Sequence, residues 1–242
     1  MLPGDEILRE RTRSWCCVDT WEGYTNSAEF ASPADTRFHL GLIPVPFIGN
    51  LARASVFVLL LNPGFGPHDY YADLKVRAFR TARIANLRQR SRVPFVEFDP
   101  EFSWHGGFRY WHSKLSNVIS HFSKNVGISF GEARKFVQSQ LAAIQLVPYH
   151  SATFALSAGV MTEMASVNLA KRYVHEVLLP KAKLRECLII VARSGRLWDL
   201  RDSPTVIVYN GAEARSAHLS IGSRGGTAMS KFLATRFRAR AA

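Results

Sequence analysis

The sequence has little cysteine and no long apolar run. Its cysteines, Cys16, Cys17 and Cys187, form no CxxC pair, so a zinc or iron–sulfur ligand set is excluded, and we expect neither a metal nor a cofactor. No segment approaches the roughly 20 apolar residues of a membrane span. Segment 1–16 also lacks the apolar stretch of a signal peptide. These absences predict a protein of the cytoplasm without a membrane partner.

Negative charge is scarce as well. Across 242 residues, 31 Lys and Arg stand against 19 Asp and Glu, which gives a net charge of +12 at pH 7. Such an excess attracts polyanions and speeds association, so nucleic acid is the expected partner. The length fits a single domain over 1–242. We expect a monomer whose core spans about 40–237 and ends in a loose basic tail at 236–242.

Four short apolar runs, at 54–61, 142–147, 186–191 and 205–209, predict buried strands. The segments around these runs have helical periodicity. One apolar face comprises Trp111, Leu115, Val118, Ile119 and Phe122, and the capping-box spacing of Ser129 and Glu132 follows it. Two further apolar stripes comprise Leu169, Tyr173, Val174, Val177 and Leu178 before Pro180, and Phe232, Leu233 and Phe237 near the end of the sequence. This alternation predicts an α/β fold, a three-layer α/β/α sandwich with a mostly parallel four-stranded sheet. Its ligand site should lie beyond the carboxyl ends of the strands.

A tight turn follows the first predicted strand. It reads Asn62-Pro63-Gly64-Phe65-Gly66-Pro67-His68-Asp69. Its glycines and prolines favour a fixed path that a ligand can approach closely. The turn has neither the P-loop pattern nor the GxGxxG of dinucleotide sites. An ordinary turn at a strand end is the alternative interpretation.

A loop rich in Gly and Ser, 210–226, follows the fourth predicted strand and contains His218-Leu219-Ser220. Because this loop and the first turn both follow strand ends, it could place His218 opposite Asn62. The alternative is that His218 is a solvated surface side chain.

Together these segments resemble the uracil-DNA glycosylase superfamily over roughly residues 40–237. Leu59-Leu60-Leu61-Asn62-Pro63-Gly64 is similar to the first family motif in the mismatch-specific and single-strand-selective branches, and His218-Leu219-Ser220 partly matches the His-Pro-Ser motif. The resemblance implies that Asn62 orients the water attacking C1′ of a flipped nucleotide and that His218 donates a hydrogen bond to the departing base. It further implies that Ser220 contacts DNA phosphate and that Phe65 stacks on the base, unless Phe65 is packed on the core.

The departures from the family pattern concern substrate size. Gly64 stands where uracil-specific enzymes place a Tyr that excludes substituents at C5 of the pyrimidine. Segment 148–151 (Pro-Tyr-His-Ser) stands where they present an Asn amide at the end of the second strand. Both departures favour a pocket open at C5, as in a bacterial phage-defence branch that removes α-glucosylated 5-hydroxymethylcytosine from phage DNA. Partners for a sugar could come from His68, Asp69, Tyr149, His150, Ser151 and the 104–107 turn.

DNA contacts are less well determined by the sequence. The wedge that fills the gap left by a flipped base could be Ile221 or Arg224, and basic groups that could follow phosphates include Arg80, Arg83, Arg88, Arg90, Arg92, Arg224, Lys231 and the arginines at 236–240. No lysine lies in either motif, which predicts a monofunctional glycosylase. The alternatives are a repair glycosylase for uracil or mismatched pyrimidine, and a non-catalytic nucleic-acid-binding module.

Overall fold

The computed structural model describes residues 1–28, 30 and 36–241, and Ala242 of the predicted tail lies outside them. The main sheet has the strand order β3-β5-β4-β6-β7. β4 (Val56–Leu60), β5 (Leu141–Gln145), β6 (Leu188–Val191) and β7 (Val206–Val208) are parallel. The mixed α/β class is therefore confirmed, whereas the predicted four-stranded sheet is wrong, because the sheet has a fifth strand.

The fifth strand is β3 (Phe47–Gly49), which pairs antiparallel with β5 at one edge. Gly49 lies at φ 101°, and a Cβ there would come within 2.5 Å of the Leu141 carbonyl oxygen, so this position requires glycine. The strand is only three residues long and follows Pro44 and Pro46. Pro46 still contributes to the pairing with β5, because its backbone carbonyl accepts a hydrogen bond from the Gln145 backbone N–H at 2.9 Å.

The central strand β4 is buried on both faces of the sheet. All five of its residues are buried, and alternate side chains point to opposite sides. Val58 and its neighbours at 56 and 60 pack into one core cluster, and Phe57 and Leu59 pack into the other. A continuous apolar run is thus what a central parallel strand with helices on both faces needs.

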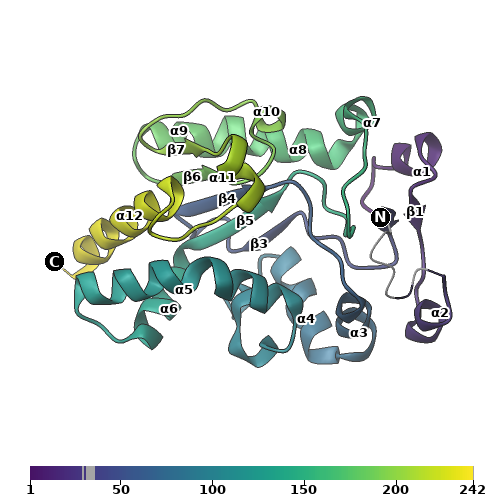
Figure 1. The fold of residues 1–242 in the computed structure, drawn as a ribbon, viewed down its shortest axis with the longest axis horizontal. Coiled ribbons are helices and arrows are strands. Elements are labelled where there is room, and N and C mark those ends of the chain that lie inside the picture. Colours follow the sequence, from purple (N-terminus) through teal and green to yellow (C-terminus); the bar gives the residue numbers. More distant parts are fainter. Residues whose placement is uncertain (29, 31–35, 242) are drawn as a thin grey trace.

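Helices cover both faces of the sheet (Figure 1). α5 (Gly106–Val126), α6 (Phe130–Gln140) and α12 (Arg224–Ala241) lie on one side, and α8 (Ala165–Tyr173) and α9 (Leu179–Lys183) lie on the other. The predicted stripe on α5 is confirmed, as its five apolar residues are all buried. The Ser129–Glu132 capping box also forms at the start of α6.

The helical stripe before Pro180 differs from the prediction. A π-helical turn, η3 (Val174–Leu178), links α8 to α9, and Pro180 lies in the first turn of α9 rather than after a helix end. A proline is tolerated there because the first turn of a helix leaves its N–H groups unpaired. Within the predicted stripe, Val174 and Leu178 are buried, whereas Leu169 is 57 % exposed.

Both chain ends pack more closely than the sequence predicted. Asp5, just before α1 (Ile7–Arg11), and Leu8, within it, are fully buried, so the core extends well before residue 40. The basic segment 236–241 is not a loose tail but the last part of α12. There, Arg236 donates to the Glu186 carbonyl, and the Arg240 guanidinium lies over the Phe136 ring.

The remaining elements are short. They are β1 (Trp15–Cys16) and β2 (Phe38–His39), which form a small parallel sheet, α2 (Trp21–Thr25), α3 (Pro67–Lys75), α4 (Arg77–Leu87), η1 (Val96–Phe98), η2 (Pro100–Phe102), α7 (Ala158–Glu163), α10 (Gly195–Trp198) and α11 (Gly211–Ser216). Among the described residues, none of the helices combines the length and the apolar character that crossing a bilayer requires.

Candidate functional site

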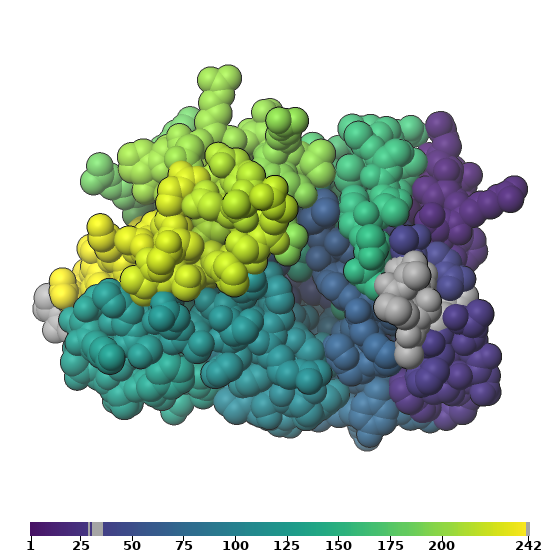
Figure 2. Space-filling view, viewed as in Figure 1, coloured from purple at the N-terminus to yellow at the C-terminus, as the bar shows by residue number. Residues whose placement is uncertain are grey.

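A cavity of about 450 Å³ lies at the carboxyl ends of the central strands. Leu60 and Gln145 at the ends of β4 and β5, and Arg193 just after β6, line it together with the first turns of α3 and α5. The chain passes from β4 to β5 on one side and then to β6 on the other, which makes this edge the switch point where doubly wound sheets bind ligands. Figure 2 shows the surface hollowed where the teal, blue and green segments meet.

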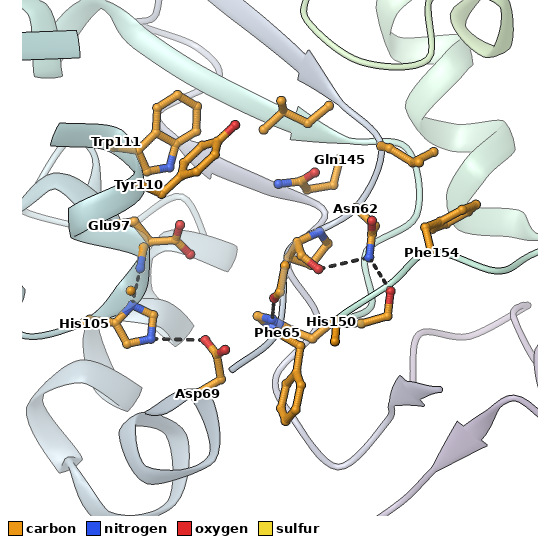
Figure 3. A pocket seen from close by; sticks show the side chains of 18 of the residues that line it. Asn62, Phe65, Asp69, Glu97, His105, Tyr110, Trp111, Gln145, His150 and Phe154 are labelled. Atoms are coloured by element: carbon orange, nitrogen blue, oxygen red, sulfur yellow. Dashed lines mark hydrogen bonds and ion pairs between the residues drawn. The ribbon is translucent and has the colours of Figure 1, made fainter. Parts of the chain in front are cut away.

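The side chain of Asn62 is held in one orientation at the mouth of β4. Its amide nitrogen donates to the Ser151 hydroxyl at 2.9 Å, to the Tyr149 carbonyl at 3.2 Å and to the Pro63 carbonyl at 3.0 Å. Because carbonyl oxygens only accept hydrogen bonds, the nitrogen must face them, and this fixes the assignment of the amide. Oδ1 receives no hydrogen bond from the described residues, so an acceptor is left at the cavity wall (Figure 3).

The turn after Asn62 is held from behind by His150. His150 Nδ1 lies 2.8 Å from the Gly64 carbonyl oxygen and therefore donates to it, and Nε2 lies 3.0 Å from a nitrogen of Arg83, from which it accepts. His150 lines the cavity, but both of its ring nitrogens are thus engaged. Gly64 also lines it, and a Cβ built there would meet nothing within 4 Å. The cavity is therefore open on the Gly64 side.

Asp69 and His105 fix the two helix starts that form another wall. Asp69 accepts from the Gly66 N–H at 2.7 Å, His105 Nδ1 accepts from the Gly107 N–H at 3.0 Å, and His105 Nε2 lies 3.2 Å from Asp69. Burial alone would raise the pKa of Asp69, but its contact with His105 and the surrounding imidazoles outweigh burial and hold the pKa well below its usual range.

The cluster of His68, Asp69 and His105 brings its ligand atoms within 4.8 Å of one another, which could suit a cation. However, His105 Nδ1 is occupied by the Gly107 N–H, so its Nε2 carries the proton and has no lone pair to offer a metal. The donor set does not fit a cation, and the cluster instead joins the starts of α3 and α5.

His68 lines the cavity and is partly exposed. Desolvation lowers its pKa, although Asp69 at 3.7 Å acts in the opposite direction. The imidazole ring also leaves no room for a side chain at position 106, because a Cβ at Gly106 would lie 2.1 Å from Nε2. His68 is thus an imidazole available to a ligand and favoured in the neutral form.

Two predicted pocket residues are placed differently. Tyr149 is buried away from the cavity, where its hydroxyl donates to Asp5 at 2.7 Å and accepts from the Leu2 N–H. Phe65 lines the cavity, but its ring stacks on His39 with centroids 3.6 Å apart and meets the edge of Tyr70. Phe65 therefore packs on the core, in line with the alternative interpretation of this residue.

Several residues that line the cavity were not among the predicted site residues. They include Glu97, Tyr110, Gln145, Phe154 and Arg193. Gln145 is the most informative, because the structure ends the second parallel strand there and so places a side-chain amide at that strand end after all. The prediction assigned this end to segment 148–151 because it extended the strand to Val147. Gln145 is the polar residue that interrupts the apolar run 142–147, and this break could have indicated the strand end.

His218 does not line the cavity. It is exposed in the segment between α11 and α12, where its backbone carbonyl accepts from the Tyr209 hydroxyl at 2.6 Å. The same segment is tied to α5, since Lys114 donates to the Ser216 carbonyl and the Ile221 N–H donates to Asn117. The structure therefore brings Asn62 together with His68, and leaves His218 outside.

The predicted DNA contacts also lie outside the cavity. Arg224 is engaged by Asp202 at 2.9 Å and by Glu213 at 3.0 Å, so its charge is already paired. Ile221 and Ser220 are partly buried, whereas Lys231 is exposed beside a separate groove on α12.

Among the arginines predicted to follow phosphates, Arg83 is buried and lies 3.6 Å from Glu97. Its buried position beside a carboxylate rules out a surface contact with DNA. The arginines at 80, 88, 90 and 92 are exposed, so they remain predictions.

Comparisons with protein-family models, with curated proteins and with solved structures found no match.

Proposed function

We propose that this protein is a monofunctional DNA glycosylase of the uracil-DNA glycosylase type, acting as a monomer without a metal or cofactor. The observation that carries the proposal is the orientation of Asn62. Its nitrogen is anchored by Tyr149 and Ser151, and its Oδ1 is left as an acceptor at the cavity wall. Such an amide cannot remove a proton as a strong base, but it can hold a water molecule in position for attack.

The reaction is a displacement at the sugar. The water held by Asn62 forms a bond from its oxygen to C1′ of the flipped nucleotide, and the bond from C1′ to the base nitrogen breaks with its electron pair leaving on the base. The water proton passes to the base or to solvent, so the products are a free base and an abasic site. Since Asn62 only orients the water, most of the acceleration must come from stabilising the departing base.

Two imidazoles compete for that stabilising role. His68 already lines the cavity. His218 is exposed, and we assign it the role on condition that segment 217–223 closes over a bound nucleotide. The segment is attached to α5 through Ser216 and Ile221, so a closing movement would have to pivot on these contacts.

The proposed substrate is a pyrimidine enlarged at C5, with α-glucosyl-5-hydroxymethylcytosine in phage DNA as the best candidate. The open space beside Gly64 and the cavity of about 450 Å³, within the usual range for ligand sites, support a large base. The biological role would be defence in the bacterial cytoplasm, where abasic sites would block replication of the phage DNA.

The surface around the cavity suits a polyanion. Arg193 lines the cavity, is exposed and makes no ion pair with a described residue. Arg109, also exposed, lies in the first turn of α5, and the neighbouring residues 106, 107 and 110 line the cavity. These two cations replace Arg83 and Arg224 as the phosphate contacts that we propose.

The test is an incision assay on DNA that contains uracil, cytosine, 5-hydroxymethylcytosine or its α-glucosylated form, followed by alkali to break abasic sites. We expect breaks with the glucosylated base, and their loss in Asn62→Ala. Asn168→Ala is a matched control, since Asn168 is an exposed asparagine on α8. Breaks with uracil alone would favour the repair glycosylase. No breaks in any lane, with binding that vanishes as salt rises, would favour a binding module.

A further inference from the structure

Glu97 is a carboxylate built into the cavity wall. It lies on η1, is 9 % exposed, and has its Oε1 3.6 Å from the buried guanidinium of Arg83. Its Oε2 rests against the start of α5, where a Cβ at Gly107 would come within 2.9 Å of it. Arg83 is fixed in turn by its hydrogen bond to His150. The carboxylate is therefore held in place by one counter-charge, and it lines the cavity without a side-chain hydrogen bond to a described residue (Figure 3).

Gln145 presents an amide to the same cavity from the end of β5. The residue is 4 % exposed, and its Oε1 is buried without a hydrogen-bond partner in the part of the chain that the structure describes. Buried polar atoms in native proteins are nearly always paired, so an unpaired one at the wall of a cavity points to a ligand. Figure 3 shows Gln145 and Glu97 reaching toward the cavity from different elements.

We propose that Glu97 and Gln145 together select a base with an exocyclic amine, which among pyrimidines means cytosine and its C5 derivatives. This inference rests on the proposed function, since the base must be flipped into the cavity. A Gln amide can rotate to offer either its carbonyl or its NH₂ group, so Gln145 suits both amine-bearing and oxo-bearing bases. A carboxylate accepts hydrogen bonds and offers none when ionised, so Glu97 decides between them.

The chemistry of position 4 of the pyrimidine explains the choice. The amine of cytosine donates to a carboxylate, which is the pairing that acidic side chains make with this base. The carbonyl of uracil or thymine would place a second acceptor against Glu97 in a dry site, and the unpaired groups would penalise binding. Glu97 thus excludes the ordinary base thymine, and the space at Gly64 provides room for the C5 substituent.

The experiment measures binding to DNA that cannot be cleaved, made with a single 2′-fluoroarabino nucleotide. Four bases are compared: cytosine, uracil, 5-hydroxymethylcytosine and 5-hydroxymethyluracil. We expect about 10-fold tighter binding of each amine-bearing base than of its oxo partner, within the range for one good base contact. Equal affinities for the two members of each pair would overturn the proposal.

This design separates the two claims. A protein that cleaves no DNA but prefers amine-bearing bases would refute the glycosylase activity and support the selection by Glu97. A protein that cleaves DNA without preferring amine-bearing bases would support the activity and refute the selection.

Variants locate the preference in one residue. Glu97→Gln should reduce the preference for the amine from about 10-fold to less than about 2-fold, because its amide can rotate to suit either base. Glu101→Gln, at an exposed glutamate on the neighbouring η2, should leave it unchanged. If the preference in Glu97→Gln equals that of the unaltered protein, the assignment is wrong.

Loss of the charge at Glu97 leaves Arg83 buried without its partner, so a second pair of variants guards against misfolding. Glu97→Asp keeps the charge but withdraws it by one methylene, and should weaken the preference as well. Gln145→Leu should weaken the binding of both classes by a similar factor, because the amide serves both. It should fold at least as well as the unaltered protein, since an unpaired buried acceptor is removed. A Gln145→Leu variant with unchanged affinity for all four DNAs would overturn its part in the proposal.

Discussion

The turn at Asn62 and the segment at His218 differ in how far each is organised before a ligand binds. Around Asn62, the amide nitrogen has three acceptors, and the Gly64 carbonyl is held by His150. Around His218, the anchors are on the backbone, at its own carbonyl and at Ser216, and its side chain is exposed. One region fixes a side chain, and the other fixes only the path of the chain.

Under the proposed mechanism, the two regions would contribute to catalysis in different ways. A group fixed before the substrate arrives needs no reorganisation during the reaction, which is the basis of electrostatic preorganisation. A side chain on an exposed segment has to be ordered by the ligand, and binding is weakened by that ordering. Substitutions in the two regions should therefore differ in their effects on turnover and on the stability of the free protein.

The largest effect is expected at Asn62. Asn62→Ala removes the proposed acceptor for the attacking water and should lower turnover by roughly 100- to 1,000-fold, as loss of one preorganised contact does elsewhere. Single-turnover excision rates measure the effect, and DNA affinity should persist. Ser151→Ala removes one anchor of the amide and keeps the acceptor, so its loss should be smaller. A larger loss in Ser151→Ala than in Asn62→Ala would assign the chemistry to the hydroxyl.

The second prediction compares the two imidazoles. His218→Ala should lower turnover by about 100-fold, the lower end for loss of proton donation, and should leave the melting temperature of the free protein unchanged because the side chain is exposed. His68→Ala should lower turnover less. The reverse order would mean that the leaving base is served by the cavity imidazole and that segment 217–223 need not close.

The third prediction tests the open side of the turn. Gly64→Tyr should lower kcat/KM for the substituted base by about 10-fold or more, the scale of steric exclusion from a pocket, because its ring enters space that is now empty. Excision of an unsubstituted base should fall less. Gly159→Tyr, at an exposed glycine on α7 that also has nothing within 4 Å, is the matched control. Equal losses on both substrates would show that Gly64 does not set substrate size.

The fold was predictable to the extent that its strands are continuous apolar runs. β4 and β6 lie where such runs predict them. A strand that is buried on both faces is apolar at every position, so the apolar run marks the strand. β3 was missed since two prolines precede it and it pairs for only three residues. The π turn was missed because the change in helical hydrogen bonding at η3 leaves no mark in the spacing of the side chains.

Site residues that directly follow a strand in the sequence were predictable, but contacts between segments far apart in the sequence were not. The turn at 62–69 follows a strand end, so the sequence placed most of it at the cavity. Arg83 and Glu97 are an ion pair between α4 and η1, and each resembles a surface charge until the fold buries them together. Tyr149 was misplaced for the same reason, since its partner Asp5 is 144 positions away in the sequence.

The smallest expected effect concerns the pH dependence of stability and again tests how firmly the first turn is built. Desolvation lowers the pKa of His68 in the folded protein below the ordinary 6.5, whereas the unfolded chain takes up a proton near that value. The unfolded state therefore binds more protons as the pH falls through about 6.5, and the free energy of unfolding declines in that window. Asp69, whose pKa is lowered from an ordinary 3.8, contributes only at lower pH, so the two windows are separate. His68→Gln should show a smaller decline between pH 7.5 and pH 5 in urea unfolding, and His121→Gln, at an exposed histidine on α5, is the control. If the free energy of unfolding of His68→Gln declines as steeply as that of the unaltered protein, the His68 imidazole is not desolvated. The turn at His68 is then packed less closely than the region around Asn62.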